Sequence, residues 1–390
     1  MSGFRQNVVR WFMTTKKTPP VPVVSGRNTA DNLYEDVLRE NCKSVFIITS
    51  KTVRNKGMLE KLIENLTKNG IKSVFFSDIV PDPTIENVER GLAVYRENQC
   101  GGVIAVGGGS VLDCAKVIAL RAANPRVSVK MMSLYVVPCK KSAPIFAVPT
   151  TSGTGSEITF FSVITDAKKH KKLPLLSDRY LPEKIVFDSA LLENVPQKPT
   201  VYAGLDALTH CIEAFISTNA KTFAEDLKSA PEVCRDIFAQ LPVAAKEPLN
   251  EEARLKMAEA AYKAGLNFRR TGVGLVHAIS HRLGETYHIP HGLACAAVLP
   301  HVLEKSLPDV QKRLKKLAVK SGTAKSAEEF IEIIRALEKS LGIPEKFTEI
   351  NERDFPVMIR RILSEAATQG CPKRLCAKEI EAILKSLKSD

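Results

Sequence analysis

Histidine and aspartate side chains recur one helical turn apart in the second half of the chain. Asp206 and His210 lie four positions apart, and so do His277 and His281. On a helix such pairs project from one face, so a single cation can bind both members. One carboxylate with three imidazoles suits Fe²⁺, Zn²⁺, Mn²⁺ or Co²⁺ and is too nitrogen-rich for Mg²⁺ or Ca²⁺. The sequence therefore predicts a divalent metal site made by Asp206 and three of five histidines: His210, His277, His281, His288 and His291.

A glycine-rich turn in the first half of the chain has the composition of a phosphate-binding loop. The apolar run 102–106 predicts a buried strand, residues 107–110 (Gly-Gly-Gly-Ser) follow it directly, and a helix is predicted from residue 111. Glycine lets the backbone approach a phosphate closely, and the N–H groups at a helix N-terminus attract the anion. The loop is neither a Walker A motif nor G-x-G-x-x-G, and a plain tight turn is the alternative. Its place between strand and helix favours nucleotide binding by residues 107–110.

A second loop, residues 148–157, follows the next predicted strand and is dense in hydroxyl groups and glycine. One interpretation is a Ser/Thr-rich cap at the start of the following element. The functional interpretation is a second wall of the nucleotide site, because loops after parallel strands meet at the carboxyl edge of the sheet, where ligands bind. The hydroxyl groups of this loop, that of Thr151 among them, would then donate to phosphate or nicotinamide.

The elements that must position these residues change character along the chain. Five short apolar runs predict buried strands, at residues 44–49, 73–76, 102–106, 144–148 and 184–187, and helix-length amphipathic segments lie between them. After about residue 200 the predicted elements are helices, at residues 203–217, 251–268, 327–341 and 377–387. We therefore predict an α/β dinucleotide-binding domain with a parallel sheet over residues 1–197, of which residues 1–20 are a short extension. An all-α metal-binding and catalytic domain follows over residues 198–390.

Composition excludes several classes of protein. The 390 residues are 44% hydrophobic and 25% charged, which excludes collagen-like and disordered chains, and no apolar run approaches the roughly 20 residues of a membrane span. Nine scattered cysteines without a C-x-x-C pair predict free thiols in the cytoplasm. Residues 1–30 are basic and contain no acid, so an organellar location is the alternative.

The net charge of +13 raises the question of a polyanionic partner. The basic residues are spread along the chain, the densest run being residues 168–172, and neither zinc-finger spacing nor an aromatic-rich RNA-binding signature accompanies them. We therefore expect a solvated surface with a bias toward small anionic ligands, and no nucleic-acid partner. Nucleic-acid binding is the rival hypothesis.

Together these motifs resemble the iron-containing (group III) alcohol dehydrogenase family, from about Val21 to the C-terminus. Residues 107–113 are similar to that family's pyrophosphate loop, and residues 149–157 to its second cofactor loop. Two further stretches resemble its metal motifs: residues 204–214, and residues 274–284 followed by 290–292 and 299–300. The resemblance implies the architecture that this family shares with dehydroquinate synthase, a Rossmann-like α/β domain followed by a helical domain.

The resemblance also assigns roles to single residues. It implies four metal ligands, with Fe²⁺ as the metal and Zn²⁺ as the alternative: Asp206, His210, His277 and His291. His281 matches a position close to the substrate and is the candidate proton relay, whereas His288 matches an unrestricted position and is a candidate supporting group. The implied cofactor contacts are Gly108, Gly109, Ser110, Thr150, Thr154, Thr159 and Lys172.

Two residues depart from the family pattern. Ser50 stands after the first predicted strand, where many NAD-using members carry an aspartate that binds the adenosine ribose. Without that acid a 2′-phosphate is not repelled, and Lys51 or Arg54 can attract it, so Ser50 predicts NADP(H) in preference to NAD(H). Cys295 replaces a common asparagine one helical turn after His291, which predicts a different metal environment or substrate range and a thiol open to oxidation.

The implied reaction is reversible hydride transfer between a nicotinamide cofactor and a small aldehyde or primary alcohol. The positive net charge permits an anionic aldehyde. The alternatives within the superfamily are a dehydroquinate-synthase-like lyase, which has no net turnover of its cofactor, and a glycerol-dehydrogenase-like polyol oxidoreductase that uses zinc. We further expect a homodimer.

Overall fold

The computed structural model describes residues 20–132, 139–169, 171–365 and 370–389. The chain divides into two compact units, the first formed by residues up to 151 and 155–195, the second by residues 152–154 and from 196 onward. The division precedes Pro196, whereas the sequence placed it after residue 197. Residues 1–19, which hold most of the predicted extension and of the basic N-terminal segment, lie outside the described residues.

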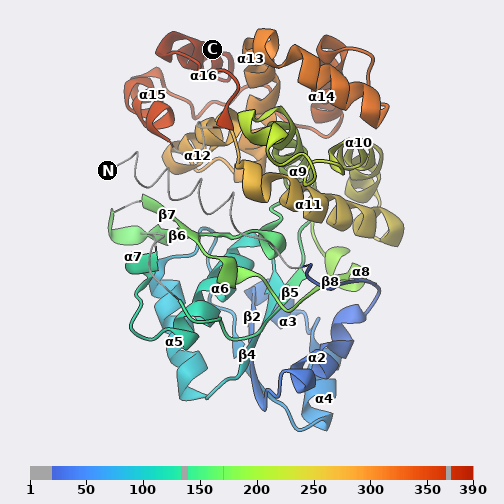
Figure 1. Ribbon diagram of the computed structural model, residues 1–390, viewed down its shortest axis with the longest axis vertical. Coiled ribbons are helices and arrows are strands. Elements are labelled where there is room, and N and C mark those ends of the chain that lie inside the picture. Colours follow the sequence, from blue (N-terminus) through green and yellow to red (C-terminus); the bar gives the residue numbers. More distant parts are fainter. Residues whose placement is uncertain (1–19, 133–138, 170, 366–369, 390) are drawn as a thin grey trace. The chain divides into compact units, whose positions relative to one another are not determined.

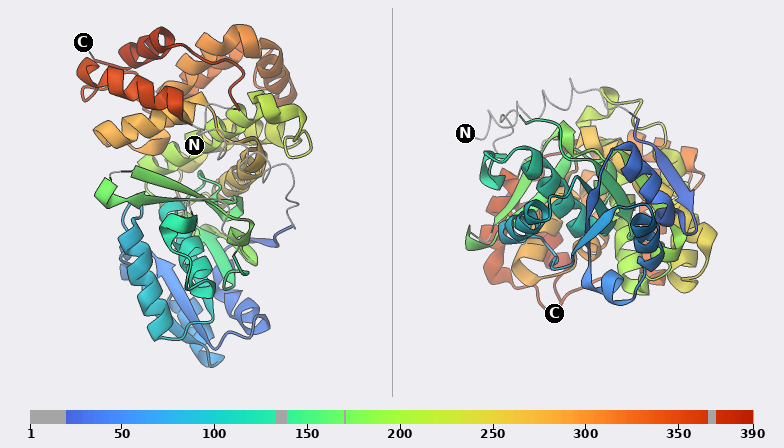
Figure 2. Two further views of the ribbon diagram at one scale, coloured as in Figure 1. Left: turned by 60° about the vertical axis from the view of Figure 1, so that its left-hand side comes forward. Right: turned by 90° about the horizontal axis from the view of Figure 1, so that it is seen from below.

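A six-stranded parallel sheet forms the centre of the first unit. The strand order is β1-β8-β5-β4-β2-β3, and every neighbouring pair is parallel. The strands are β1 (Val23–Gly26), β2 (Ser44–Thr49), β3 (Lys72–Phe76), β4 (Gly102–Gly107), β5 (Ile145–Pro149) and β8 (Lys184–Asp188). Strands β2, β4, β5 and β8 are rich in buried apolar residues because helices cover both faces of a parallel sheet. Figure 1 and Figure 2 show these helices on either side of the strands.

Successive strand residues pack against different helices. Ile47 and Ile104 share a buried cluster with residues of α2 (Leu33–Arg39) and α4 (Glu60–Lys68). The ring of Phe46 instead packs edge-to-face with Tyr95 of α5 (Ile85–Glu97), with 5.7 Å between the ring centroids. This alternation follows from the two-residue period of a strand. The helices of the unit are α2 (Leu33–Arg39), α3 (Lys51–Asn55), α4 (Glu60–Lys68), α5 (Ile85–Glu97), α6 (Gly109–Ala123), α7 (Val129–Met132) and α8 (Ser189–Leu192).

A separate antiparallel hairpin follows β5. Its strands are β6 (Phe161–Asp166) and β7 (Lys171–Leu176), and Ile164 pairs with Leu173. The sequence did not predict this hairpin, because lysines and a proline interrupt the apolar pattern of β7. It also missed β1, which is short, mostly exposed and at the edge of the sheet.

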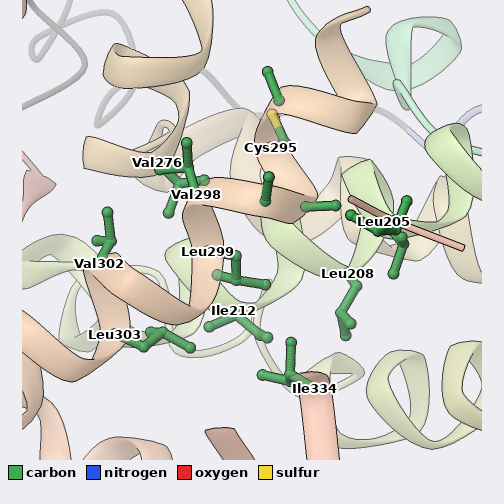
Figure 3. Close-up of a cluster of buried hydrophobic side chains, with 14 of the residues drawn as sticks. Leu205, Leu208, Ile212, Val276, Cys295, Val298, Leu299, Val302, Leu303 and Ile334 are labelled. Carbon is green, nitrogen blue, oxygen red and sulfur yellow. The ribbon is translucent and has the colours of Figure 1, made fainter. Parts of the chain in front are cut away.

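The described part of the second unit is built from helices. They are α9 (Gln197–Ile216), α10 (Ala230–Lys246), α11 (Glu251–Thr271), α12 (Leu275–Tyr287), α13 (His291–Ser321), α14 (Ala327–Ser340), α15 (Phe355–Ser364) and α16 (Ala377–Ser386). The central α9 packs against α10, α11 and α13. In Figure 3, Leu205, Leu208 and Ile212 of α9 lie in one buried cluster with Val298 and Leu299 of α13.

The predicted order of an α/β unit followed by a helical unit is confirmed. Sequence periodicity found α9, α11, α14 and α16 but did not assign α10, α13 or α15. None of the described helices is long and apolar enough to cross a membrane.

Candidate metal centre and cofactor loops

Helix α9 carries three buried polar side chains along one stripe. Asp206, His210 and Glu213 follow the i, i+4, i+7 spacing, and their exposed fractions are 3%, 5% and 5%. Apolar residues occupy most of the remaining turns, so the helix is buried almost all round. Buried polar groups of this kind need a partner, because desolvation without one costs about 1–3 kcal/mol or more.

Two further helices bring the other imidazoles to Asp206. His277 lies near the start of α12 and is buried, and His291 is the first residue of α13. Between the two helices, His288 adopts a left-handed backbone (φ 57°) at the end of α12, and the chain turns there. The side chain of His288 is exposed and has no described contact with the cluster.

Three of the candidate ligands converge on a carboxylate oxygen of the fourth, Asp206. Asp206 Oδ1 lies 3.5 Å from His277 Nε2, 3.6 Å from His291 Nε2 and 3.9 Å from His210 Nε2. Among the described residues, neither Asp206 Oδ1 nor His277 Nε2 has a hydrogen-bond partner. Ligand atoms about 2.1 Å from a tetrahedral cation stand about 3.4 Å apart, close to these separations. The donor set therefore fits Fe²⁺ or Zn²⁺ in size and chemistry.

The electrostatics of the cluster suit a cation. Burial lowers the pKa of His210 to about 4, so this imidazole is neutral at pH 7 and offers a lone pair. Burial raises the pKa of Asp206, but the facing imidazoles, led by His210 and His291, more than offset this and hold the pKa well below its usual range. Burial likewise lowers the pKa of His291 to about 3, so the neutral rings of His210 and His291 offer lone pairs beside the Asp206 carboxylate.

Cys295 also reaches this cluster, as its place after His291 predicted. Its Sγ lies 3.7 Å from His291 Nε2, and donor atoms of Asp206, His277, His291 and Cys295 all lie within 4.8 Å of one another. This set contains Cys295 where the family resemblance implies His210. We favour His210, because its Nε2 faces Asp206 Oδ1 and its ring stacks on that of His277 at 4.5 Å. The thiol is fully buried and burial raises its pKa to about 11, which disfavours the predicted oxidation.

His281 lies beside the cluster. Its ring stacks on that of His291 with 5.3 Å between centroids, and its side chain is 29% exposed. Its Nδ1 lies 2.6 Å from Glu365 Oε1, and Arg282 donates to Glu365 Oε2 at 3.0 Å. An ionised carboxylate only accepts hydrogen bonds, so the neutral ring of His281 carries its proton on Nδ1. Its Nε2 can then exchange a proton with a bound substrate.

The glycine loop lies where β4 ends and α6 begins. A Cβ on Gly107 would stand 2.6 Å from Val111 Cγ2, so this tight turn requires glycine. The Thr150 N–H donates to the Gly107 carbonyl at 3.0 Å, and a Cβ on Gly108 would lie 3.1 Å from Thr151 Oγ1. The structure thus brings together five predicted cofactor residues at one edge of the sheet: Gly108, Gly109, Ser110, Thr150 and Thr151.

The other predicted cofactor residues have different surroundings. Thr159 is buried and its hydroxyl contacts the Ser156 carbonyl, and Lys172 of β7 pairs with Asp82 at 2.7 Å. Thr154 belongs to the second unit, where the neighbouring Gly153 packs on Ala203 of α9. Ser50 caps α3 by accepting from the Val53 N–H at 3.2 Å.

Sequence reasoning missed the groups that support these sites. Glu213 was detectable, because it continues the spacing of Asp206 and His210 by one more turn. Glu365 contacts His281 although the two residues are 84 positions apart, and no local sequence pattern predicts this contact. The buried side chain of Lys116 on α6 also went unnoticed, since its partners, which include Ser156 and Phe161, lie 40 or more positions away.

A parallel-sheet unit with a glycine loop, followed by a helical unit with converging donor atoms, is the arrangement expected of an enzyme that uses a nucleotide and a metal ion. The chain matches two family descriptions, "Iron-containing alcohol dehydrogenase" over residues 20–189 and "Fe-containing alcohol dehydrogenase family, C-terminal" over residues 200–388. The chain therefore belongs to the iron-containing alcohol dehydrogenase family, as its motifs predicted. It is an oxidoreductase of that family, which favours the dehydrogenase over the lyase.

Individual relatives span nearly the whole chain. NAD-dependent methanol dehydrogenase of Bacillus methanolicus is 31% identical over 383 residues, covering 96% of this chain and 100% of its own. Lactaldehyde reductase of Escherichia coli (strain K12) is 31% identical, covering 91% and 94%. The crystal structure of sulfoacetaldehyde reductase from Bifidobacterium kashiwanohense in complex with NAD⁺ is similar with a TM-score of 0.89 and 28% identity, covering 96% and 98%.

Proposed function

We propose that this enzyme is a metal-dependent aldehyde reductase, reversible as an alcohol dehydrogenase, with Asp206, His210, His277 and His291 as ligands of Fe²⁺ or Zn²⁺. The observation that carries the proposal is the convergence of three imidazole nitrogens on one buried carboxylate oxygen at 3.5–3.9 Å. A divalent cation held there supplies the Lewis acidity that polarises an aldehyde oxygen.

The chain's own residues supply the remaining steps. The glycine loop presents the N-terminus of α6 to the cofactor pyrophosphate, with Gly108, Gly109 and Ser110 at the contact. His281 exchanges the alcohol proton at Nε2, while Glu365 accepts from Nδ1 and holds the ring in that orientation. The burial of Asp206 and His277 shields these two proposed ligands from water.

The cofactor preference rests on Ser50, and we propose NADP(H). No acid stands at this position, and Arg54 lies nearby on α3 with its guanidinium over the Phe75 ring at 5.1 Å. Against this, Lys51 already pairs with Asp78 at 3.5 Å, and two relatives carry NAD in their names. Steady-state comparison of NADPH with NADH tests the preference. A higher kcat/KM with NADPH supports it, and a higher kcat/KM with NADH overturns it.

We propose a small aldehyde as substrate, with anionic aldehydes included. The net charge of +13 favours capture of an anion, and one relative reduces sulfoacetaldehyde according to its name. The test compares sulfoacetaldehyde with uncharged propanal at low and at high salt. The charge argument predicts that high salt raises KM for the anion alone, and it fails if both aldehydes respond equally.

We also propose a cytoplasmic homodimer. The cytoplasmic location rests on nine cysteines, all of which are free thiols in the structure. Cell fractionation tests the compartment, and recovery in an organellar fraction would overturn it. Light scattering on the purified chain tests the assembly, for which a mass of twice 42.9 kDa is expected.

A further inference from the structure

Glu213 is a buried carboxylate beside the proposed metal ligands, and the proposed function gives it no role. It lies one helical turn beyond His210 on α9 and is 5% exposed. Its carboxylate does not face Asp206. It faces the start of α12, where three N–H groups reach it.

All three of these contacts are short. Glu213 Oε2 accepts from the Gly274 N–H at 2.7 Å and lies 2.6 Å from His277 Nδ1, while Oε1 accepts from the Val276 N–H at 2.7 Å. The carboxylate thus occupies the N-terminus of α12, where unpaired N–H groups favour negative charge. A Cβ on Gly274 would stand 2.6 Å from Oε1, so this close approach requires glycine there.

The hydrogen bond with Glu213 determines which nitrogen of His277 can bind a metal ion. An ionised carboxylate only accepts hydrogen bonds, so the imidazole carries its proton on Nδ1. The lone pair is therefore on Nε2, the atom that lies 3.5 Å from Asp206 Oδ1 and has no hydrogen-bond partner among the described residues. With the side chain of His277 only 2% exposed, the ring has little freedom to turn.

We propose that Glu213 is a positioning residue for metal binding: it fixes the tautomer and orientation of His277 and strengthens Nε2 as a ligand. The inference rests on the proposed function, because it takes His277 as a ligand. Carboxylate partners of metal-binding histidines typically contribute 10–100-fold to metal affinity. A purely structural role, as a cap of α12, is the competing explanation, and it would alter folding without altering the metal affinity of the folded protein.

The experiment compares Glu213→Gln with Glu338→Gln in the full-length, metal-stripped chain. Glu338 is also a buried glutamate of the helical unit, 7% exposed, but lies on α14 and contacts none of the proposed ligands. Co²⁺ affinity is measured by chelator competition at a temperature where thermal unfolding shows every variant to be folded. Glu213→Gln should bind Co²⁺ 10–100-fold more weakly than wild type, and Glu338→Gln should bind it like wild type. Equal affinities in the two variants would overturn the inference.

A second readout reports the tautomer directly. In ¹⁵N-histidine spectra of the metal-stripped protein, at a pH where His277 is neutral, the His277 signal, assigned by its loss in His277→Ala, should show the Nδ1-protonated tautomer in wild type and less of it in Glu213→Gln. If Glu213→Gln does not fold, Glu213→Asp replaces it, keeps the charge and should lie between wild type and His277→Ala in affinity. Wild-type Co²⁺ affinity in His277→Ala would instead overturn the proposed ligand set itself. The two failures are therefore distinguishable.

Discussion

Each unit contains a buried polar cluster, and the two clusters differ in whether their polar atoms have hydrogen-bond partners. In the sheet unit, Lys116 donates to Ser156 Oγ at 2.9 Å, to the Phe161 carbonyl at 2.8 Å and to the Thr159 carbonyl at 3.2 Å. Asp113 accepts from Ser156 Oγ at 2.5 Å and from the Val163 N–H at 2.8 Å. In the helical unit, Asp206 Oδ1 and His277 Nε2 face each other and have no hydrogen-bond partner among the described residues.

The difference separates a scaffold from a ligand site. The Lys116 cluster joins α6, which begins at the glycine loop, to the segment that follows the second cofactor loop, and its charges balance one another. In the Asp206 cluster, facing buried donor atoms have no hydrogen-bond partner among the described residues, and burial without a partner is costly, which is why we propose that a cation binds there. A buried polar group is thus a candidate ligand when its partners are missing, and a structural element when they are present.

The largest expected effect comes from removing one proposed metal ligand from the Asp206 cluster. His277→Ala should abolish stoichiometric metal binding and lower turnover at least ~1000-fold, because a buried ligand is lost. Metal analysis after dialysis and NAD(P)H oxidation with an aldehyde measure both. Retained metal together with retained activity would contradict the assignment.

A substitution in the Lys116 cluster should instead lower stability without changing metal affinity. Lys116→Met leaves the buried Asp113 without its neighbouring cation, which should lower the free energy of unfolding by about 3 kcal/mol and leave Co²⁺ affinity unchanged. Lys61→Met is the matched control, since its ion pair with Glu64 is exposed and contributes at most about 1 kcal/mol. Urea unfolding measures the difference. If the two variants were equally stable, the scaffold role of Lys116 would be wrong.

Glu338 is a third case, because its side chain is buried and its Oε1 has no hydrogen-bond partner among the described residues. Burial raises its pKa to about 9, so the folded state keeps it protonated while the unfolded state ionises near pH 4.5. This contribution to stability is complete below pH 4.5 and is lost as the pH rises toward 9. Glu338→Gln should therefore be more stable than wild type at pH 8 and nearly equal to it at pH 4.5. Parallel pH dependences in urea unfolding would contradict this account.

The sequence predicted the fold better than the site. Strands such as β2 and β4 are fully buried apolar runs, and their composition alone identifies them. The edge strand β1 lacks that pattern because it is only four residues long and mostly exposed. Asp206 and His210 share a helix face and were found from spacing, but spacing could not choose His291 over His288. That choice depends on a turn and a second helix, and it came from the family resemblance.

Supporting residues were the hardest to predict. Glu365 and Lys116 have partners far along the chain, and only the folded structure brings them together. Their roles are defined by tertiary contacts, which a single sequence does not encode in any local period.

The most direct test of the central claim is the rate of NADPH and NADH oxidation by metal-stripped protein as Fe²⁺ or Zn²⁺ is added back in the presence of a short aldehyde. We predict no aldehyde-dependent oxidation without metal, and a rate that rises until one equivalent per chain is bound. An undiminished rate after metal removal would contradict the account, and so would stoichiometric metal binding without any aldehyde-dependent oxidation.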